Sequence, residues 1–165
     1  MDFLKIMKIS LIDIGSVDYA QQLQHHAEAI MERLGYTPKE AKIAKDLVEV
    51  RKRALEDYKL IFSKYHFEEG KNEIFIENNA YMVQKLTYDG ATVTWSGEFF
   101  GITDHTQTWN GKVVITEREL FELYKTEYLY ENHKEDIPGA YVAYFERCYG
   151  LAGMFKNFVN ATKVR

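Results

Sequence analysis

The sequence predicts an α+β fold with an N-terminal helical hairpin, an antiparallel β-meander of about five strands and two C-terminal helices. Three observations support this class. Apolar residues recur at helical spacing in the first and last parts of the chain, and they alternate with polar residues in the middle. Asp-Gly and Asn-Gly pairs interrupt the alternating part, as tight hairpin turns do. Because no linker or composition break divides the 165 residues, we expect a single α+β domain over residues 1–165.

The opening residues 3–14 are compatible with two structures. Ile9 and Leu11 alternate with polar neighbours as in a strand, whereas Phe3, Met7 and Leu11 follow helical spacing. Of these two structures, we favour the strand.

Two long helices are expected next, packed as an antiparallel hairpin. The first is expected to begin near Ser16 or Asp18 and to end at Gly35, which can adopt the left-handed conformation of a helix C-cap. The second has a clear start at Thr37–Glu40, which offers a capping threonine, a proline in the first turn and a glutamate for a capping box. Its apolar spacing predicts a helix over 38–66.

The middle of the chain is expected to form the meander. Asp89-Gly90 suits a two-residue turn, which would place Leu86 opposite Val93. This register gathers the apolar side chains on one face, which we expect to be the core face: Met82, Leu86, Val93, Trp95 and Phe99.

A second hairpin turn is predicted at Asn110-Gly111, where it would pair Trp109 with Lys112. An earlier strand at 73–76 is expected to join the same sheet.

The last part of the chain returns to helical spacing. Thr116–Glu119 is another capping box and predicts a helix over 117–133. Asp136-Ile137-Pro138 is expected to cap the final helix, in which Gly150 and Gly153 either admit another backbone or break the helix.

Composition narrows the functional classes. A net charge of −4 disfavours nonspecific nucleic-acid binding, and 15% aromatic residues argue against disorder. The single cysteine, Cys148, excludes an internal disulfide framework, and its place in the apolar stripe of the last helix predicts a core position. Because neither a signal peptide nor an apolar segment of membrane-spanning length is visible, we expect a cytoplasmic protein with no membrane partner.

The histidines show no clear metal-ligand pattern. His25 and His26 are adjacent on a predicted helix and point about 100° apart, so they do not share an ion easily. The other histidines are His66, His105 and His133. Among them, we find a second ligand at a useful spacing only for His105, which has Asp104 beside it. We therefore expect neither a metal site nor a cofactor.

Charge is distributed unevenly along the chain. Residues 67–136 hold 14 Asp and Glu against 6 Lys and Arg, whereas 37–66 hold 8 Lys and Arg against 5 Asp and Glu. At the end of the acidic stretch, carboxylates cluster with tyrosines, which offer large contact area at low entropic cost. The predicted partner-binding residues are Tyr124, Glu127, Tyr128, Tyr130, Glu131, Glu135 and Asp136.

These features favour a non-enzymatic interaction protein that binds a protein with a basic surface and modulates it, for example by inhibition. In size and composition the chain is of the physical type of compact inhibitors encoded by phages or mobile elements, and of immunity proteins. A homodimer stays open. An enzyme is less favoured, because no phosphate-binding loop, nucleophile elbow or metalloprotease helix is present.

Two alternatives remain. One is a small enzyme or ligand-binding domain with an aromatic-lined pocket between sheet and helices, for which the candidate residues are Trp95, Glu98, His105 and Trp109. The other is a nucleic-acid-binding regulator that uses the basic turn of helix 38–66, namely Arg51, Lys52 and Arg53. Neighbouring carboxylates partly neutralise that turn, so nucleic acid is the less favoured partner.

Overall fold

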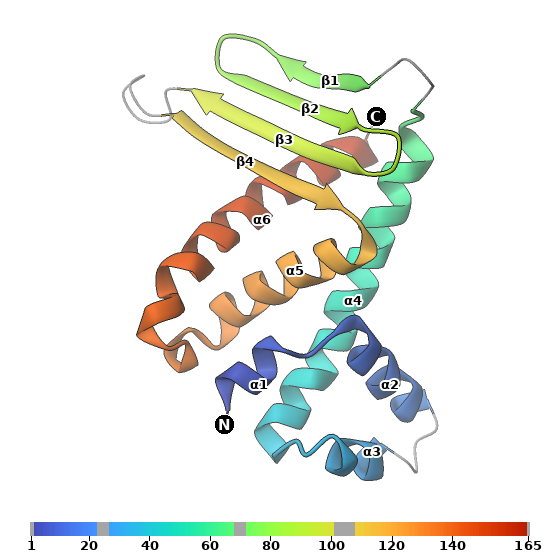
Figure 1. The fold of residues 1–165 in the computed structure, drawn as a ribbon, viewed down its shortest axis with the longest axis vertical. Coiled ribbons are helices and arrows are strands. Elements are labelled where there is room, and N and C mark those ends of the chain that lie inside the picture. The colour runs from blue at the N-terminus through green and yellow to red at the C-terminus, as the bar shows by residue number, and fades with distance from the viewer. Residues whose placement is uncertain (1, 23–26, 68–71, 101–107, 165) are drawn as a thin grey trace. The chain divides into compact units, whose positions relative to one another are not determined.

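The computed structural model describes residues 2–22, 27–67, 72–100 and 108–164, and Figure 1 labels their helices and strands. The class is α+β, as predicted. The chain forms two compact units, the first from Met1–Glu56 with Phe121–Tyr149 and the second from Asp57–Leu120 with Gly150–Arg165. The helices are α1 Phe3–Met7, α2 Leu11–Gln22, α3 Ala27–Arg33, α4 Pro38–Lys64, α5 Glu117–Asn132 and α6 Val142–Lys163. The strands are β1 Glu73–Asn78, β2 Met82–Tyr88, β3 Val93–Phe100 and β4 Thr108–Ile115.

The preference for a strand over residues 3–14 is wrong, because α1 and the start of α2 occupy them. Asp2 caps α1, where its carboxylate accepts the Lys5 N–H at 3.3 Å. Ser10 and Asp13 then form a reciprocal cap, in which each side chain accepts the other residue's backbone N–H at 3.2 and 3.0 Å. These two caps start helices where alternation of apolar residues suggested a strand.

The predicted start of the first long helix, near Ser16 or Asp18, is also too late in the chain. The Ser10 cap places the start of α2 at Leu11, and α2 ends at Gln22. The second segment, α3, ends before Gly35, whose φ of 72° provides the predicted left-handed C-cap. An N-terminal helical region is therefore confirmed, in several segments instead of one helix.

The capping box of α4 is confirmed. Thr37 Oγ1 accepts the Glu40 N–H at 3.2 Å, and Glu40 Oε1 accepts the Thr37 N–H at 2.9 Å. Glu40 is buried and also accepts the Asp2 N–H at 3.1 Å, so it joins α1 to α4. The backbone hydrogen bond from Thr37 lowers the pKa of Glu40. The helix ends at Lys64, two residues before the predicted end.

The described strands form one antiparallel sheet in the order β1-β2-β3-β4, four strands and not about five. The predicted register of β2 and β3 is wrong by two residues, since Leu86 lies opposite Trp95. The cause is a longer turn, in which Asp89 Oδ1 accepts the N–H groups of Ala91 and Thr92 at 2.9 and 2.7 Å. Because the shift is two residues, every side chain keeps its predicted face.

Asn110-Gly111 lies inside β4 and is not a turn, which removes the fifth strand. Gly111 is opposite Gly97 in β3, and a Cβ at Gly111 would lie 2.7 Å from Leu151 Cδ1 of α6. Trp109 Cη2 of the same strand would lie equally close, so the glycine leaves room for both side chains.

The core face of the sheet is confirmed around Trp95, which is fully buried. Its ring meets Phe155 edge-on at 5.6 Å between centroids and stacks on Phe158 at 6.1 Å, both from α6. Its indole N–H donates to Gln84 Oε1 at 3.3 Å, so the buried polar atom is satisfied.

The two C-terminal helices are confirmed. Thr116 Oγ1 caps α5 by accepting the Glu119 N–H at 3.0 Å. The last helix begins only at Val142, after short 3-10 turns at Lys134–Asp136 and Gly139–Tyr141. Gly153 neither breaks α6 nor admits another backbone, since no described atom lies within 4 Å of its ideal Cβ position. Among the described residues, no helix has the length and apolar character needed to cross a membrane.

Candidate functional site

The predicted partner-binding residues lie at the C-terminal end of α5 and in the turn that follows, and the structure separates them into different environments. Tyr124 is only 2% exposed and belongs to the core. Tyr128 is half-buried, and its hydroxyl donates to Asp46 Oδ2 of α4 at 2.6 Å. Burial and the Asp46 carboxylate raise the pKa of Tyr128, so this phenol stays protonated. Neither tyrosine is available as a surface anchor.

At the C-terminal end of α5, the predicted surface also includes Tyr149, a residue of α6. Tyr130 of α5 packs on Tyr149 of α6, with ring centroids 5.0 Å apart, and the Tyr149 hydroxyl donates to Glu131 Oε1 at 3.4 Å. The charge of Glu131, with a smaller contribution from Glu127, raises the pKa of Tyr149. We call Glu127, Tyr130, Glu131 and Tyr149 the acidic tyrosine surface; all four belong to the first unit.

Tyr149 was absent from the sequence prediction. It lies 18 residues after Glu131, on a different helix, and the sequence contains no pattern that pairs the two. Only the packing of α6 against α5 within the first unit brings it to the surface that the sequence identified.

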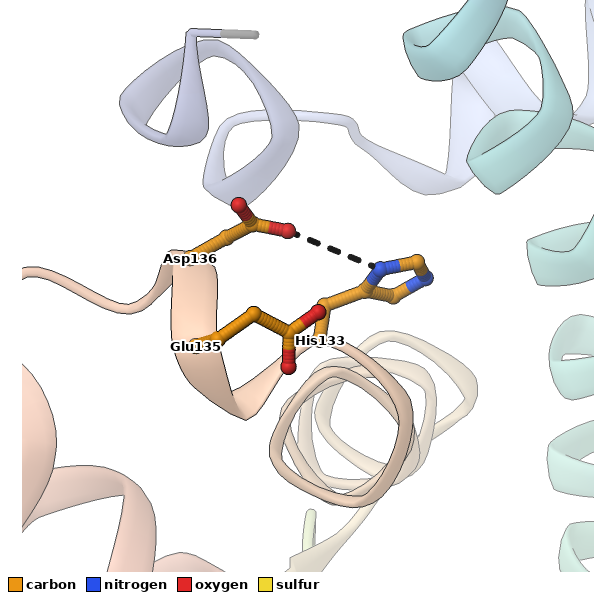
Figure 2. Close-up of side chains that lie close together, drawn as sticks. All are labelled: His133, Glu135 and Asp136. Carbon is orange, nitrogen blue, oxygen red and sulfur yellow. Dashed lines mark ion pairs between the residues drawn. The ribbon is translucent and has the colours of Figure 1, made fainter.

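The last two predicted residues, Glu135 and Asp136, lie in the 3-10 turn after α5, beside His133 (Figure 2). One ring nitrogen of His133 and one carboxylate oxygen from each acid lie within 4.8 Å of one another. The sequence prediction did not place any carboxylate near His133, and the structure brings two of them close to its ring. The spacing His-x-Glu-Asp at the end of a helix could have identified this group, because a tight turn brings such positions together.

Asp136 is shared between two positive or potentially positive groups. Its Oδ2 lies 3.0 Å from the Lys39 ammonium of α4 and 3.8 Å from His133 Nδ1. Glu135 is exposed. The turn thus presents an imidazole and two carboxylates at the surface of the first unit, a set suited to cation binding.

The alternative pocket residues that the structure describes do not all lie on one face of the sheet, although Trp109 shares the core face with Trp95. Trp95 is on the core face of β3, whereas Glu98 is exposed on the opposite face, across from Val83. Trp109 of β4 packs on Phe99, with centroids 5.6 Å apart. His105, like its neighbour Asp104, falls outside the described residues.

Hollows are present in both units of the described part of the chain. One of about 230 Å³ lies between the sheet and α6 in the second unit, lined by Ile76, Glu77, Met82, Gln84, Phe99, Met154, Asn157, Phe158 and Ala161. Another, of about 410 Å³, lies beside α3 and α4 in the first unit, lined by Met31, Glu32, Tyr36, Pro38, Ala41, Lys42 and Lys45. Neither contains a predicted site residue.

The basic turn of α4 is largely paired. Arg51 lies 3.6 Å from Asp18, and Lys52 lies 3.5 Å from Glu49. Arg53 is exposed, but consecutive helical residues point about 100° apart, so the three cations do not share one face.

Cys148 is half-buried and does not lie in the core as expected. Burial raises the pKa of its thiol, which keeps the sulfur protonated and unreactive as a nucleophile.

Comparisons of the chain with protein-family models, with curated proteins and with solved structures found no match. The functional interpretation therefore depends on the geometry of this chain alone.

Proposed function

We propose that this chain is a non-enzymatic protein that binds the basic surface of a partner protein and modulates that partner, for example by inhibition. The supporting observation is a contact within the chain itself. The Lys134 ammonium lies 4.8 Å from the centroid of the Tyr130 ring. Its pKa is raised by a hydrogen bond to Tyr130 and, more weakly, by the charge of Glu146. A cation is thus already held where an aromatic face and carboxylates combine.

A partner's arginine or lysine would find the same combination on Tyr149. This ring is 38% exposed, it is braced by Tyr130, and the Glu131 carboxylate lies at its hydroxyl. Tyrosine provides a rigid aromatic face with few rotatable bonds, and the carboxylates attract a basic partner during approach. The acidic tyrosine surface therefore fits a basic protein segment better than an acidic or apolar one.

Binding of a fluorescent oligo-arginine peptide, followed by anisotropy over a series of salt concentrations, tests this proposal. The charge-reversed variant Glu127→Lys/Glu131→Lys should bind more weakly and with a flatter salt dependence than wild type. A matched control is Glu49→Lys/Glu56→Lys, which changes the net charge equally at two exposed positions of α4. Equal losses in both variants would show that net charge alone attracts the peptide, and the proposed surface would be wrong.

The aromatic contribution is tested separately. Tyr149→Ala should weaken binding of the peptide about two- to fivefold, since an exposed cation–π contact contributes about 0.5–1 kcal/mol. Tyr149→Phe keeps the ring and should retain most of the affinity. If alanine and phenylalanine at this position are equivalent, the ring is not part of the contact.

A small enzyme or ligand-binding domain is a second candidate, for which the hollow between the sheet and α6 would have to be the ligand site. Its volume of about 230 Å³ is below the ~300–1,000 Å³ usual for small-molecule sites. Nucleic-acid binding by α4 stays a prediction that salt-sensitive retention on a heparin column would support. The single cysteine still favours the cytoplasm as the proposed compartment.

A further inference from the structure

The turn after α5 gathers ligand types that bind transition-metal ions. His133 contributes an imidazole nitrogen, and Glu135 and Asp136 each contribute a carboxylate oxygen, all within 4.8 Å of one another (Figure 2). Imidazole nitrogen with carboxylate oxygen is a usual donor set for zinc, whereas calcium and magnesium prefer oxygen alone.

The hydrogen-bond network determines which nitrogen of His133 is free. Tyr128 Oη has one proton and donates it to Asp46 Oδ2 at 2.6 Å. Its contact of 3.3 Å with His133 Nε2 therefore requires that Nε2 carries the N–H. The lone pair of a neutral imidazole is then on Nδ1, the atom nearer to Asp136. Histidines that bind metals usually donate their other N–H in this way, which fixes the ring.

The distance between the two candidate ligands also fits an ion between them. Nδ1 lies 3.8 Å from Asp136 Oδ2, which is too long for a hydrogen bond. Two atoms bound to one zinc ion at about 2.0–2.2 Å lie about 3.4 Å apart in a tetrahedral site. A small movement of these half-buried side chains is enough to reach that spacing, and two electron-rich atoms facing each other favour a cation in the gap.

We propose that His133, Glu135 and Asp136 bind a divalent transition-metal ion such as Zn²⁺, with Tyr128 positioning the imidazole. Three protein ligands leave a coordination position for water or another ligand. This inference does not depend on the proposed function, since the acidic tyrosine surface contains none of the three ligands.

The Lys39 ammonium competes with a metal ion for the Asp136 carboxylate. Its ammonium lies 3.0 Å from Asp136 Oδ2, and the lysine side chain is 52% exposed. An exposed pair of this kind contributes about 0–1 kcal/mol, so a metal ion can displace it. Removal of the ammonium should therefore tighten metal binding, an effect that a purely structural role of the turn does not predict.

Calorimetric titration of the full chain with zinc chloride, and with magnesium chloride as a hard-cation control, tests the site. Wild type should bind one zinc ion in this turn and no magnesium. Glu135→Gln changes an exposed ligand and should weaken zinc binding at least about tenfold, and His133→Gln should abolish binding in the turn. His66→Gln replaces an exposed histidine elsewhere and should leave the affinity unchanged.

Two variants that keep all three ligands make the test sharper. Tyr128→Phe should weaken zinc binding about 10- to 100-fold, because the Nε2–H loses its acceptor. Lys39→Met should tighten it about two- to fivefold. Circular dichroism of each variant controls for folding. Zinc affinity that is equal in wild type, His133→Gln and Glu135→Gln, or no zinc binding in wild type, would overturn the proposal.

Discussion

Replacement of the buried Lys125 by methionine should destabilise the first unit strongly. Lys125 is 2% exposed, and its ammonium makes three polar contacts that match its three N–H donors. It donates to Met7 O at 2.7 Å and Ile9 O at 2.8 Å, and it lies 2.9 Å from Glu122 Oε2. A residue of α5 thus holds the chain at the junction of α1 and α2, where residues 3–14 become helical.

The magnitude follows from these contacts. Methionine preserves the length and apolar packing of the lysine stem but leaves two carbonyl oxygens, at Met7 and Ile9, without this donor. An unsatisfied buried polar group costs about 1–3 kcal/mol, and the variant no longer needs to desolvate an ammonium. We therefore expect a net loss of about 2–4 kcal/mol in the free energy of unfolding.

Urea denaturation followed by far-UV circular dichroism measures this loss. Glu122→Gln is the matched control, because its carboxylate is 42% exposed and its pair with Lys125 should contribute about 1 kcal/mol or less. Hydrogen exchange should also show reduced protection of the amides in α1. If Lys125→Met has the wild-type midpoint and an unchanged m-value, the two carbonyl contacts contribute nothing measurable and the reasoning is refuted.

Three further predictions concern folding. Gly153→Ala should raise the free energy of unfolding by about 0.5–1 kcal/mol, because the added Cβ would be unobstructed. Gly97→Ala should lower it by about 1–3 kcal/mol, because the added Cβ would lie 2.9 Å from the buried Trp95 ring. Urea denaturation of the two variants compares these effects. Trp95→Ala should cost about 3–5 kcal/mol and shift the thermal midpoint accordingly. The pKa of Glu40 is lowered on folding, so its carboxylate stabilises the fold above its unfolded pKa and ceases to do so as pH falls through the folded value. Glu40→Gln should therefore be less stable than wild type by about 1–2 kcal/mol at pH 7, with the difference vanishing in acid, as denaturation over a pH series would show.

The capping sequences at Thr37 and Thr116 correctly predicted where two helices begin. Thr37–Glu40 and Thr116 start helices as expected, because a hydroxyl and a carboxylate at those spacings satisfy backbone N–H groups by purely local contacts. The reciprocal cap of Ser10 and Asp13 is equally local and could have been recognised. The strand prediction used only an alternation of apolar residues, which is too short here to define a strand.

The sheet shows which errors depend on distant contacts. The longer turn at Asp89 comes from its own side chain, and a shift of two residues left the faces intact. Asn110-Gly111 has the composition of a turn, yet it lies inside β4, where the glycine leaves room for the side chains of Trp109 and Leu151. Leu151 is 40 residues away in the chain, so its contact with this strand is not visible in the local pattern that suggested a turn.

The candidate site was only partly predictable for the same reason. The sequence treated α5 as an amphipathic helix with an acidic outer face, but the polar residues Lys125 and Thr126 are buried with satisfied side chains. The residues that stay exposed lie mainly at the two ends of α5, and Glu131 is at its C-terminal end. Tyr149 of α6 then completes the aromatic surface, because Tyr124 is buried and the Tyr128 hydroxyl is bound to Asp46. Charge along the sequence therefore located the region, whereas the choice of tyrosines depended on packing between helices far apart in the chain.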